Sequence, residues 1–301
     1  MGARALGPDP VLDSTFEAPA RPDSVGVVPP VGRQGMVGSD VNTGERSTLR
    51  AVALPTEHGG WSLTLEPALL GLLVAWSWPG LALGVAAMLA FVARTPLKLV
   101  LVDRRRGRWL QRTSVAARAA AVELLAIVNL VGAAALGGDG RFWLPLLAAA
   151  PLIGIELWFD VRSRSRRLLP ELAGTVGIGS VAAAIALADG AQAEMALGLW
   201  VVVAARATAA IPYARTQVFR ARGRPHHIRH SDLAQVLAVV AATGAWLAGA
   251  VPLAATIAIA VVAAFNVGAV RAAPRPAKVI GVQQMLFGIA VVTTTAIAVL
   301  A

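Results

Sequence analysis

The sequence of 301 residues contains no cysteine and little charge. The absence of cysteine excludes disulfides, thiolate zinc sites and cysteine nucleophiles. Only 15% of the residues are charged, whereas about a quarter is usual for a soluble domain. Hydrophobic residues make up 56% of the chain, and the mean hydropathy is +0.66. The few polar side chains cannot cover this much apolar surface in water. The sequence therefore predicts an integral membrane protein.

Lysine is also scarce, because Lys98 and Lys278 are the only two and every other cationic side chain is an arginine. The net charge is +10, and a basic excess is one sign of a nucleic-acid partner. Here the basic stretches are short, separated and poor in aromatic residues on which bases could stack. We therefore expect no nucleic-acid partner and look for a topological role of the arginines.

Residues 1–50 are polar and rich in Pro, Gly, Asp, Ser and Arg, without periodicity. No apolar stretch follows a basic start, so we expect no signal peptide. A segment of this kind cannot bury enough apolar surface to offset its ordering entropy, so we expect a disordered cytoplasmic tail. A regulatory or partner-binding arm is the alternative.

Residues 51–301 carry nine apolar segments near the length of about 20 residues that a transmembrane helix needs. Turn signals such as Trp78-Pro79-Gly80 and Asp189-Gly190 separate them. The predicted fold is all-α, a polytopic membrane domain of about nine transmembrane helices. The predicted helices are 61–78, 80–102, 115–136, 142–159, 168–188, 195–212, 233–250, 252–270 and 279–300.

The basic residues lie on one side of this arrangement. The connections after the second, fourth, sixth and eighth predicted helices hold 17 basic residues, whereas those after the other helices hold only Arg141. Under the positive-inside rule this asymmetry places the N-terminus in the cytoplasm and the C-terminus outside. We therefore expect a multi-pass protein of the bacterial cytoplasmic membrane, with the lipid bilayer as its first partner.

Several ionisable residues fall inside the predicted helices, where a charge costs about 2.5 kcal/mol or more at the centre and so marks a candidate site. All of them lie in the half nearer the cytoplasm, which predicts a polar cavity open to that side. Structural ion pairs are one alternative to a binding site. The other is that a side chain close to the interface extends its charged end into water, which applies to Arg94, Lys98, Arg118 and Glu171. The candidates for ligand binding are Glu66, Arg94, Lys98, Glu123, Glu156 and Arg206.

Cations at Arg94, Lys98 and Arg206 suit a phosphate or carboxylate, for which arginine offers a bidentate fork. The carboxylates would pair with these cations in the empty site, act as a general base or carry protons. The leading hypothesis is therefore binding of an anionic, lipid-linked small molecule. The alternatives are a proton-coupled transporter or exporter with Glu66, Glu123 and Glu156 as carriers, and a non-catalytic membrane scaffold.

The motif Glu57-His58-Gly59-Gly60-Trp61 opens the membrane domain. Proline and glycine would bend the chain there, but Glu57 and His58 at the cavity mouth are candidate catalytic groups, since histidine exchanges protons near neutral pH. This motif, followed by Glu66-Pro67, resembles the start of the YwiC-like family of bacterial membrane proteins, with Thr56 and Gly60 as departures. The stretches 93–97 and 276–281 are also similar to that family. The resemblance extends over residues 51–301 and implies a membrane protein without an established chemistry.

The predicted architecture distantly resembles the UbiA-type prenyltransferases, whose likeness implies a prenyl diphosphate held through magnesium on two aspartate-rich motifs. Here the first motif is echoed only by Asp103-Arg104-Arg105-Arg106-Gly107, which makes Asp103 a further ligand-binding candidate. The second region, from Arg206 through Tyr213, has no aspartate. The usual ligands for magnesium are therefore lacking, and a diphosphate would have to be held by Arg94, Lys98 and Arg206 directly.

Two other patterns are expected to be structural. His226, His227 and His230 have a spacing that can share a metal on a helix, but the surrounding arginines repel cations, so no metal site is predicted. The glycines in 174–180 lie inside a predicted helix with no strand before them, which favours close helix packing over a nucleotide loop. The sequence assigns no cofactor and no oligomeric state.

Overall fold

The computed structural model of the chain describes residues 58–162 and 167–301. These residues form nine α-helices and one 3₁₀ helix and contain no strand, which confirms the all-α prediction. The predicted tail, residues 1–50, lies outside the described residues. The helices are α2 (His58–Val74), α3 (Trp78–Arg105), α4 (Gln111–Gly137), η1 (Gly140–Phe142), α5 (Trp143–Val161), α6 (Leu168–Ala188), α7 (Ala193–Ala221), α8 (Ile228–Leu247), α9 (Leu253–Ala269) and α10 (Ala277–Leu300).

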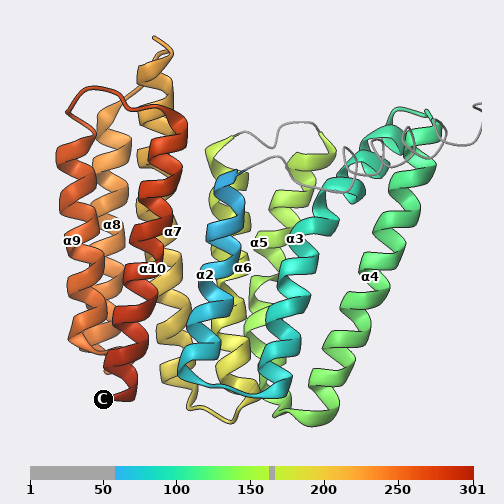
Figure 1. The fold of residues 1–301 in the computed structure, drawn as a ribbon, viewed down its shortest axis with the longest axis horizontal. Helices are drawn as coiled ribbons and strands as arrows, with labels where there is room; N and C mark the ends of the chain where they lie inside the picture. The colour runs from blue at the N-terminus through green and yellow to red at the C-terminus, as the bar shows by residue number, and fades with distance from the viewer. Residues whose placement is uncertain (1–57, 163–166) are drawn as a thin grey trace, which may run out of the picture. The chain divides into compact units, whose positions relative to one another are not determined.

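Successive helices run in opposite directions along the bundle (Figure 1). Helices α3, α5, α7 and α9 therefore all end at one end of the bundle, and the chain ends at the other. The connections at the first end include the arginine-rich stretches 104–108 and 220–224, as well as 271–275. We call it the arginine-rich end. The helical hairpins thus gather basic residues that are far apart in the sequence.

Helix α6 lies at the centre of the bundle and packs against α2, α3, α5 and α7. It is mostly buried because its residues are small enough for neighbouring backbones to approach closely. A Cβ added at Gly177 would lie 2.8 Å from Ile153 Cδ1 on α5. On the other side, Ile185 of α6 fills the space that a side chain at Gly71 of α2 would need. The prediction that the glycines of this helix serve close packing is confirmed.

The outer surface of the bundle is apolar, as a lipid solvent requires. Large hydrophobic side chains are exposed along the helices, with Leu136 on α4 and Ile297 on α10 among the most exposed. Of the described helices, six are long and apolar enough to cross a membrane, namely α3, α4, α6, α7, α10 and α5 extended by η1. Two shorter apolar helices, Gly60–Val74 and Leu253–Ala269, accompany them. The chain is a multi-pass membrane protein.

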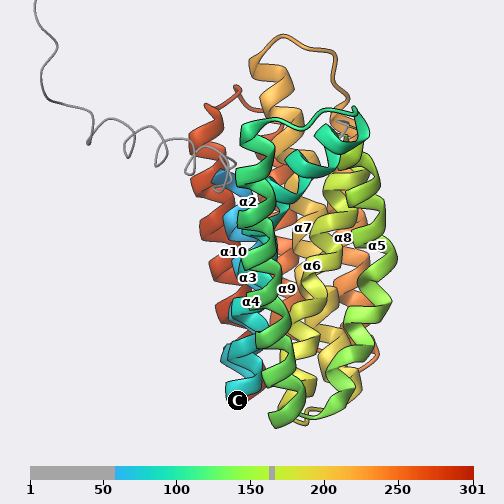
Figure 2. The same cartoon turned by 90° about the vertical axis from the view of Figure 1, so that its right-hand side faces the viewer.

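Two helices extend beyond their apolar segments at the arginine-rich end. Helix α3 continues to Arg105 and α7 to Ala221, whereas the sequence predicted ends at residues 102 and 212. Basic residues in a last turn interact favourably with the negative end of the helix dipole, so arginines do not terminate the helices there. Arg215 and Arg220 therefore lie within α7, and the prediction that they lie in a connection after the helix is wrong. Figure 2 shows the same bundle from the side, with α4 and α5 toward the viewer.

Candidate functional site

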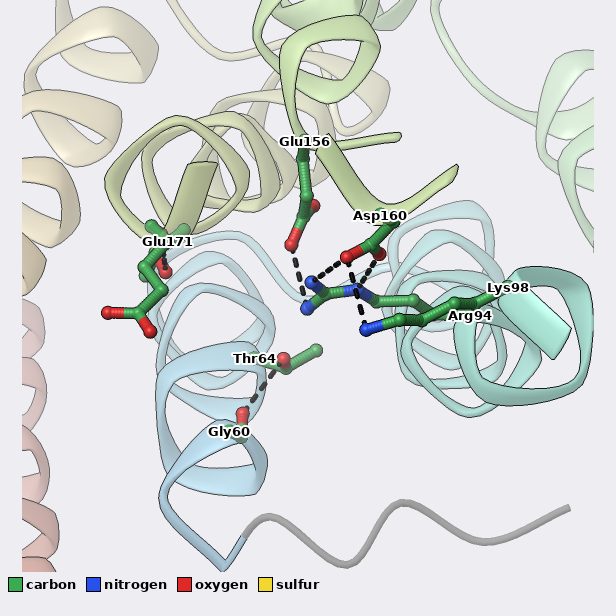
Figure 3. Close-up of polar contacts among 8 residues, drawn as sticks. Gly60, Thr64, Arg94, Lys98, Glu156, Asp160 and Glu171 are labelled. Atoms are coloured by element: carbon green, nitrogen blue, oxygen red, sulfur yellow. Dashed lines mark hydrogen bonds and ion pairs between the residues drawn. The ribbon is translucent and has the colours of Figure 1, made fainter. Parts of the chain in front are cut away.

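Four charged side chains meet between α3 and α5, and we call them the Arg94 cluster: Arg94, Lys98, Glu156 and Asp160. Arg94 donates two hydrogen bonds to Asp160, from Nε to Oδ2 at 2.8 Å and from a terminal nitrogen to Oδ1 at 3.2 Å. Its other terminal nitrogen lies 2.7 Å from Glu156 Oε1. Lys98 Nζ lies 3.4 Å from Asp160 Oδ1. In Figure 3 the two cations extend from α3 toward the two carboxylates of α5.

The spacing along each helix explains this arrangement. Arg94 and Lys98 are four residues apart on α3, and Glu156 and Asp160 are four apart on α5. Residues four apart share one face of a helix, so the two pairs can face each other across the contact between α3 and α5. Pro96 lies between the two cations and cannot donate the usual hydrogen bond to the carbonyl four residues earlier.

The cluster is neutral as a whole but differs in exposure from one side to the other. The Asp160 side chain is 1% exposed and Glu156 is 14% exposed, whereas Arg94 and Lys98 are 29% and 35% exposed. The Glu156 carboxylate occupies the space beside Gly174 of α6, where any Cβ would collide with it. The cluster therefore presents half-exposed cations above a buried carboxylate. Such an arrangement can exchange one carboxylate for the anion of a ligand.

A second polar group lies in the other half of the bundle, and we call it the Arg206 network. Arg206 of α7 is 1% exposed, and its terminal nitrogen lies 3.7 Å from Glu66 Oε1 on α2. The guanidinium donates to both the side-chain oxygen, at 3.1 Å, and the main-chain carbonyl of Gln284 on α10. Gln284 donates to Asn266 of α9 at 3.1 Å, and Asn266 donates to Gln235 of α8 at 3.3 Å. The network thus connects five helices.

Burial gives the Arg206 network a different character from the Arg94 cluster. All five side chains are buried. Gln235 returns the chain of hydrogen bonds to α7 by donating to the Ala209 carbonyl at 2.8 Å. Two polar atoms, Glu66 Oε1 and Arg206 Nε, have no hydrogen-bond partner among the described residues. Polar networks in a low-dielectric interior fix the arrangement of the helices that share them.

The comparisons with known proteins agree with the motif at the start of the membrane domain. Residues 54–186 match the YwiC-like protein family. The match confirms the resemblance drawn from Glu57-His58-Gly59-Gly60-Trp61, while the similar stretch 276–281 lies beyond the matched residues. No curated protein and no solved structure matches the chain. The resemblance to UbiA-type prenyltransferases is therefore still a prediction.

The YwiC-like segment contains the whole Arg94 cluster and Glu66, whereas Arg206 and its partners on α8, α9 and α10 lie outside it. The sequence predicted a single ligand site that contains the cations Arg94, Lys98 and Arg206. The structure places Arg206 in a separate, dry network, so of these three cations Arg94 and Lys98 alone combine charge with exposure. We take the Arg94 cluster as the candidate functional site.

The other predicted residues of the YwiC-like segment lie apart from this cluster or outside the described part. Asp103 accepts a hydrogen bond from Thr113 at 2.7 Å and lies 3.7 Å from Arg112, so it joins the end of α3 to the start of α4. Glu123 is half-buried on α4, and its Oε2 has no hydrogen-bond partner among the described residues. Glu57 lies outside the described residues, and His58 is described only as the first residue of α2. Their catalytic roles stay predictions.

Sequence reasoning missed Asp160, the residue that anchors both cations. The predicted helix ended at residue 159, whereas α5 continues to Val161 and places Asp160 one turn beyond Glu156. The spacing of four between two acids was the signal that could have identified it. Gln235 was also missed, because an amide side chain carries no charge that stands out in an apolar helix. Within the described residues no group of three or more His, Asp or Glu is arranged to hold a metal.

Proposed function

We propose that the chain crosses the bacterial cytoplasmic membrane nine times, with its N-terminus in the cytoplasm and its C-terminus outside. The alternation of α2 to α10 supports this topology, because it gathers the basic connections at one end of the bundle. The positive-inside rule assigns such an end to the cytoplasm. On this topology the Arg94 cluster belongs to the cytoplasmic half.

We further propose that the Arg94 cluster binds an anionic small molecule that is linked to a lipid, such as an isoprenyl diphosphate. The carrying observation is the exposure of Arg94 and Lys98 beside carboxylates that already satisfy them. Arginine binds phosphate oxygens with the same fork that it offers to a carboxylate. A phosphate is therefore a direct replacement for one of the carboxylates.

The geometry distinguishes the two carboxylates. Asp160 is buried, receives two hydrogen bonds from Arg94 and lies near Lys98, so it stays with the cations. Glu156 lies 2.7 Å from Arg94 and is more exposed than Asp160. The ligand would take the place of Glu156 and add Lys98 as a second cation, while Glu156 moves away or takes up a proton.

Thermal stability of the detergent-purified protein tests this proposal, because a ligand that binds the folded state raises the melting midpoint. The probes are isoprenyl diphosphates, inorganic pyrophosphate and quinones, each with and without magnesium. Lys98→Met removes a cation of the cluster, and Lys278→Met is a matched control that removes the only other lysine. We expect a concentration-dependent rise with an isoprenyl diphosphate that Lys98→Met abolishes and Lys278→Met retains.

Three outcomes would contradict parts of the proposal. The absence of a shift with any phosphorylated lipid would overturn it. An equal shift in both lysine variants would remove the Arg94 cluster from the binding site. A shift that requires magnesium would show that carboxylates such as Asp103 hold the ligand through the metal.

Proton-coupled transport is the second candidate, and one observation favours it. Glu66 lies in the middle of α2, and its buried Oε1 has no hydrogen-bond partner among the described residues. Ionisable residues at such positions serve as proton carriers in transporters. In proteoliposomes, Glu66→Gln would abolish substrate flux driven by a pH gradient, whereas a merely structural Glu66 would leave the flux of the folded protein unchanged.

A further inference from the structure

Helix α4 lies at the edge of the bundle and packs mainly against α3 (Figures 1 and 2). Its buried residues include Ala116, Ala120 and Ala134, whose spacing places them on one face of the helix. Of the six long apolar helices in the described part, α4 has the smallest buried share. The face of α4 turned away from α3 is therefore left to lipid or to another protein molecule.

The exposed face of α4 carries residues at the spacing by which two helices pack along a seam. Alternate steps of three and four residues connect five exposed positions, which we call the α4 seam: Val122, Leu125, Asn129, Gly132 and Leu136. This alternation keeps the residues on one line along a helix that pairs with a second helix. A Cβ added at Gly132 would meet nothing within 4 Å, and a glycine at such a place lets two backbones approach closely.

The α4 seam contains one polar side chain in the apolar part of the helix. Glu123 and Asn129 are the only polar side chains in residues 119–137, and of these two Asn129 is the exposed one. Asn129 donates one N–H to the Leu125 carbonyl at 2.7 Å. Its second N–H and its Oδ1 have no partner among the described residues. Hydrocarbon offers none either, so the position favours contact with another polar group.

Thr293 of α10 provides the contrast. It is also exposed on an apolar helix, and its hydroxyl donates to the Ile289 carbonyl at 2.8 Å. A hydroxyl has a single hydrogen, so this bond satisfies the only donor of Thr293 within its own helix. An amide keeps one donor and one strong acceptor after the same kind of bond, which is the situation of Asn129.

We propose that the chain forms a dimer in which the α4 seam packs against the α4 seam of a second copy. Both copies insert in the same orientation, so a two-fold axis along the membrane normal brings each seam residue opposite itself. The Asn129 amide both donates and accepts, so two copies satisfy each other, and this self-complementarity favours a second copy over a different partner. A single asparagine in such a seam fixes the register and the number of helices. Arg118, which is exposed one turn before the seam, is long enough to extend to the lipid headgroups. The proposal does not depend on ligand binding by the Arg94 cluster.

Disulfide cross-linking in membranes tests the contact, because the chain contains no cysteine of its own. Leu125→Cys places a thiol in the α4 seam, and Leu124→Cys places one beside it on the same helix but outside the seam. Ile297→Cys on α10 is the control for random collisions, since Ile297 is 70% exposed and Leu125 is 64% exposed. On mild oxidation we expect Leu125→Cys alone to give a product of twice the mass of the chain. Equal cross-linking of Leu125→Cys and Ile297→Cys, or a product of another mass, would overturn the proposal.

Förster transfer between labelled full-length chains in liposomes, measured over a range of protein-to-lipid ratios, gives the dissociation constant of the dimer. Asn129→Leu should raise this constant about tenfold, the effect of a polar contact between membrane helices. Thr293→Leu is the matched control and should leave the constant unchanged. Gly132→Leu should also weaken the dimer, and it increases helix propensity, so the loss would not reflect a weaker helix. A dimer as tight in Asn129→Leu as in the wild type, or an equal loss in Thr293→Leu, would overturn the proposal.

Discussion

Removal of the buried guanidinium of Arg206 should destabilise the protein more than removal of any other arginine in the described part. In Arg206→Leu, Glu66 loses the cation that lies 3.7 Å away, and Gln284 loses the donor to its side-chain and main-chain oxygens. Breaking a buried ion pair by removing one partner costs about 3 to 5 kcal/mol. Leucine restores much of the lost packing, so the loss reflects mainly the unpaired carboxylate and the unsatisfied oxygens of Gln284.

A double-mutant cycle separates these contributions. Unfolding by denaturing detergent gives the free energy for wild type, Arg206→Leu, Glu66→Leu and the double variant. If the pair is coupled, the double variant should be more stable than the sum of the single losses predicts, by about 1 to 3 kcal/mol. Because Gln284 still holds the guanidinium, Glu66→Leu should cost less than Arg206→Leu. Additive losses, or an Arg206→Leu variant as stable as the wild type, would refute the role of the network in holding α2 to the C-terminal helices.

Three further expectations follow from the geometry. Gly288→Ala should lower the melting midpoint, because its Cβ would push the buried Glu66 carboxylate out of its place beside α10. Gly281→Ala on the same helix meets nothing and should be neutral or slightly stabilising, so equal effects would contradict the packing. In this cysteine-free chain, single cysteines at Ala272 and Ala248 should be labelled by an impermeant maleimide from opposite sides of the membrane, and labelling from one side would refute the proposed topology. Hydrogen bonds from Arg141 hold the pKa of Asp139 below its usual range. The small contribution of this carboxylate to stability is therefore present above its unfolded-state pKa and is lost as the pH falls through its folded-state pKa. The melting midpoint of Asp139→Asn should differ from that of the wild type at neutral pH and converge with it in acid, and a difference that stays constant with pH would contradict this.

The sequence predicted one polar cavity, whereas the bundle contains two separate polar groups. The Arg94 cluster lies within the YwiC-like segment and keeps its cations half-exposed, whereas the Arg206 network is buried and connects α2 with α7, α8, α9 and α10. Exposure of the charged groups decides which of the two is suited to a ligand. The dry network is suited to fixing the helices on which the cluster depends.

The sequence by itself determined that the protein is helical and embedded in lipid. In the hydrocarbon core every backbone polar group must be satisfied within the protein, so long apolar segments such as 115–136 and 168–188 form helices. Both were predicted close to their observed bounds, α4 (Gln111–Gly137) and α6 (Leu168–Ala188). The short motif at Glu57 was also enough to predict the family match over residues 54–186, because it combines residue types that packing alone does not require.

Only the tertiary structure decided which charges meet. Arg94 and Asp160 are 66 residues apart, and Arg206 and Gln284 are 78 apart, so no local spacing joins them. An apolar helix surface is about as stable against lipid as against another helix, so hydropathy does not reveal which helices are neighbours. The neighbours are determined by close contacts that form only when the helices are packed, such as those of Gly174 with Glu156 and of Gly288 with Glu66.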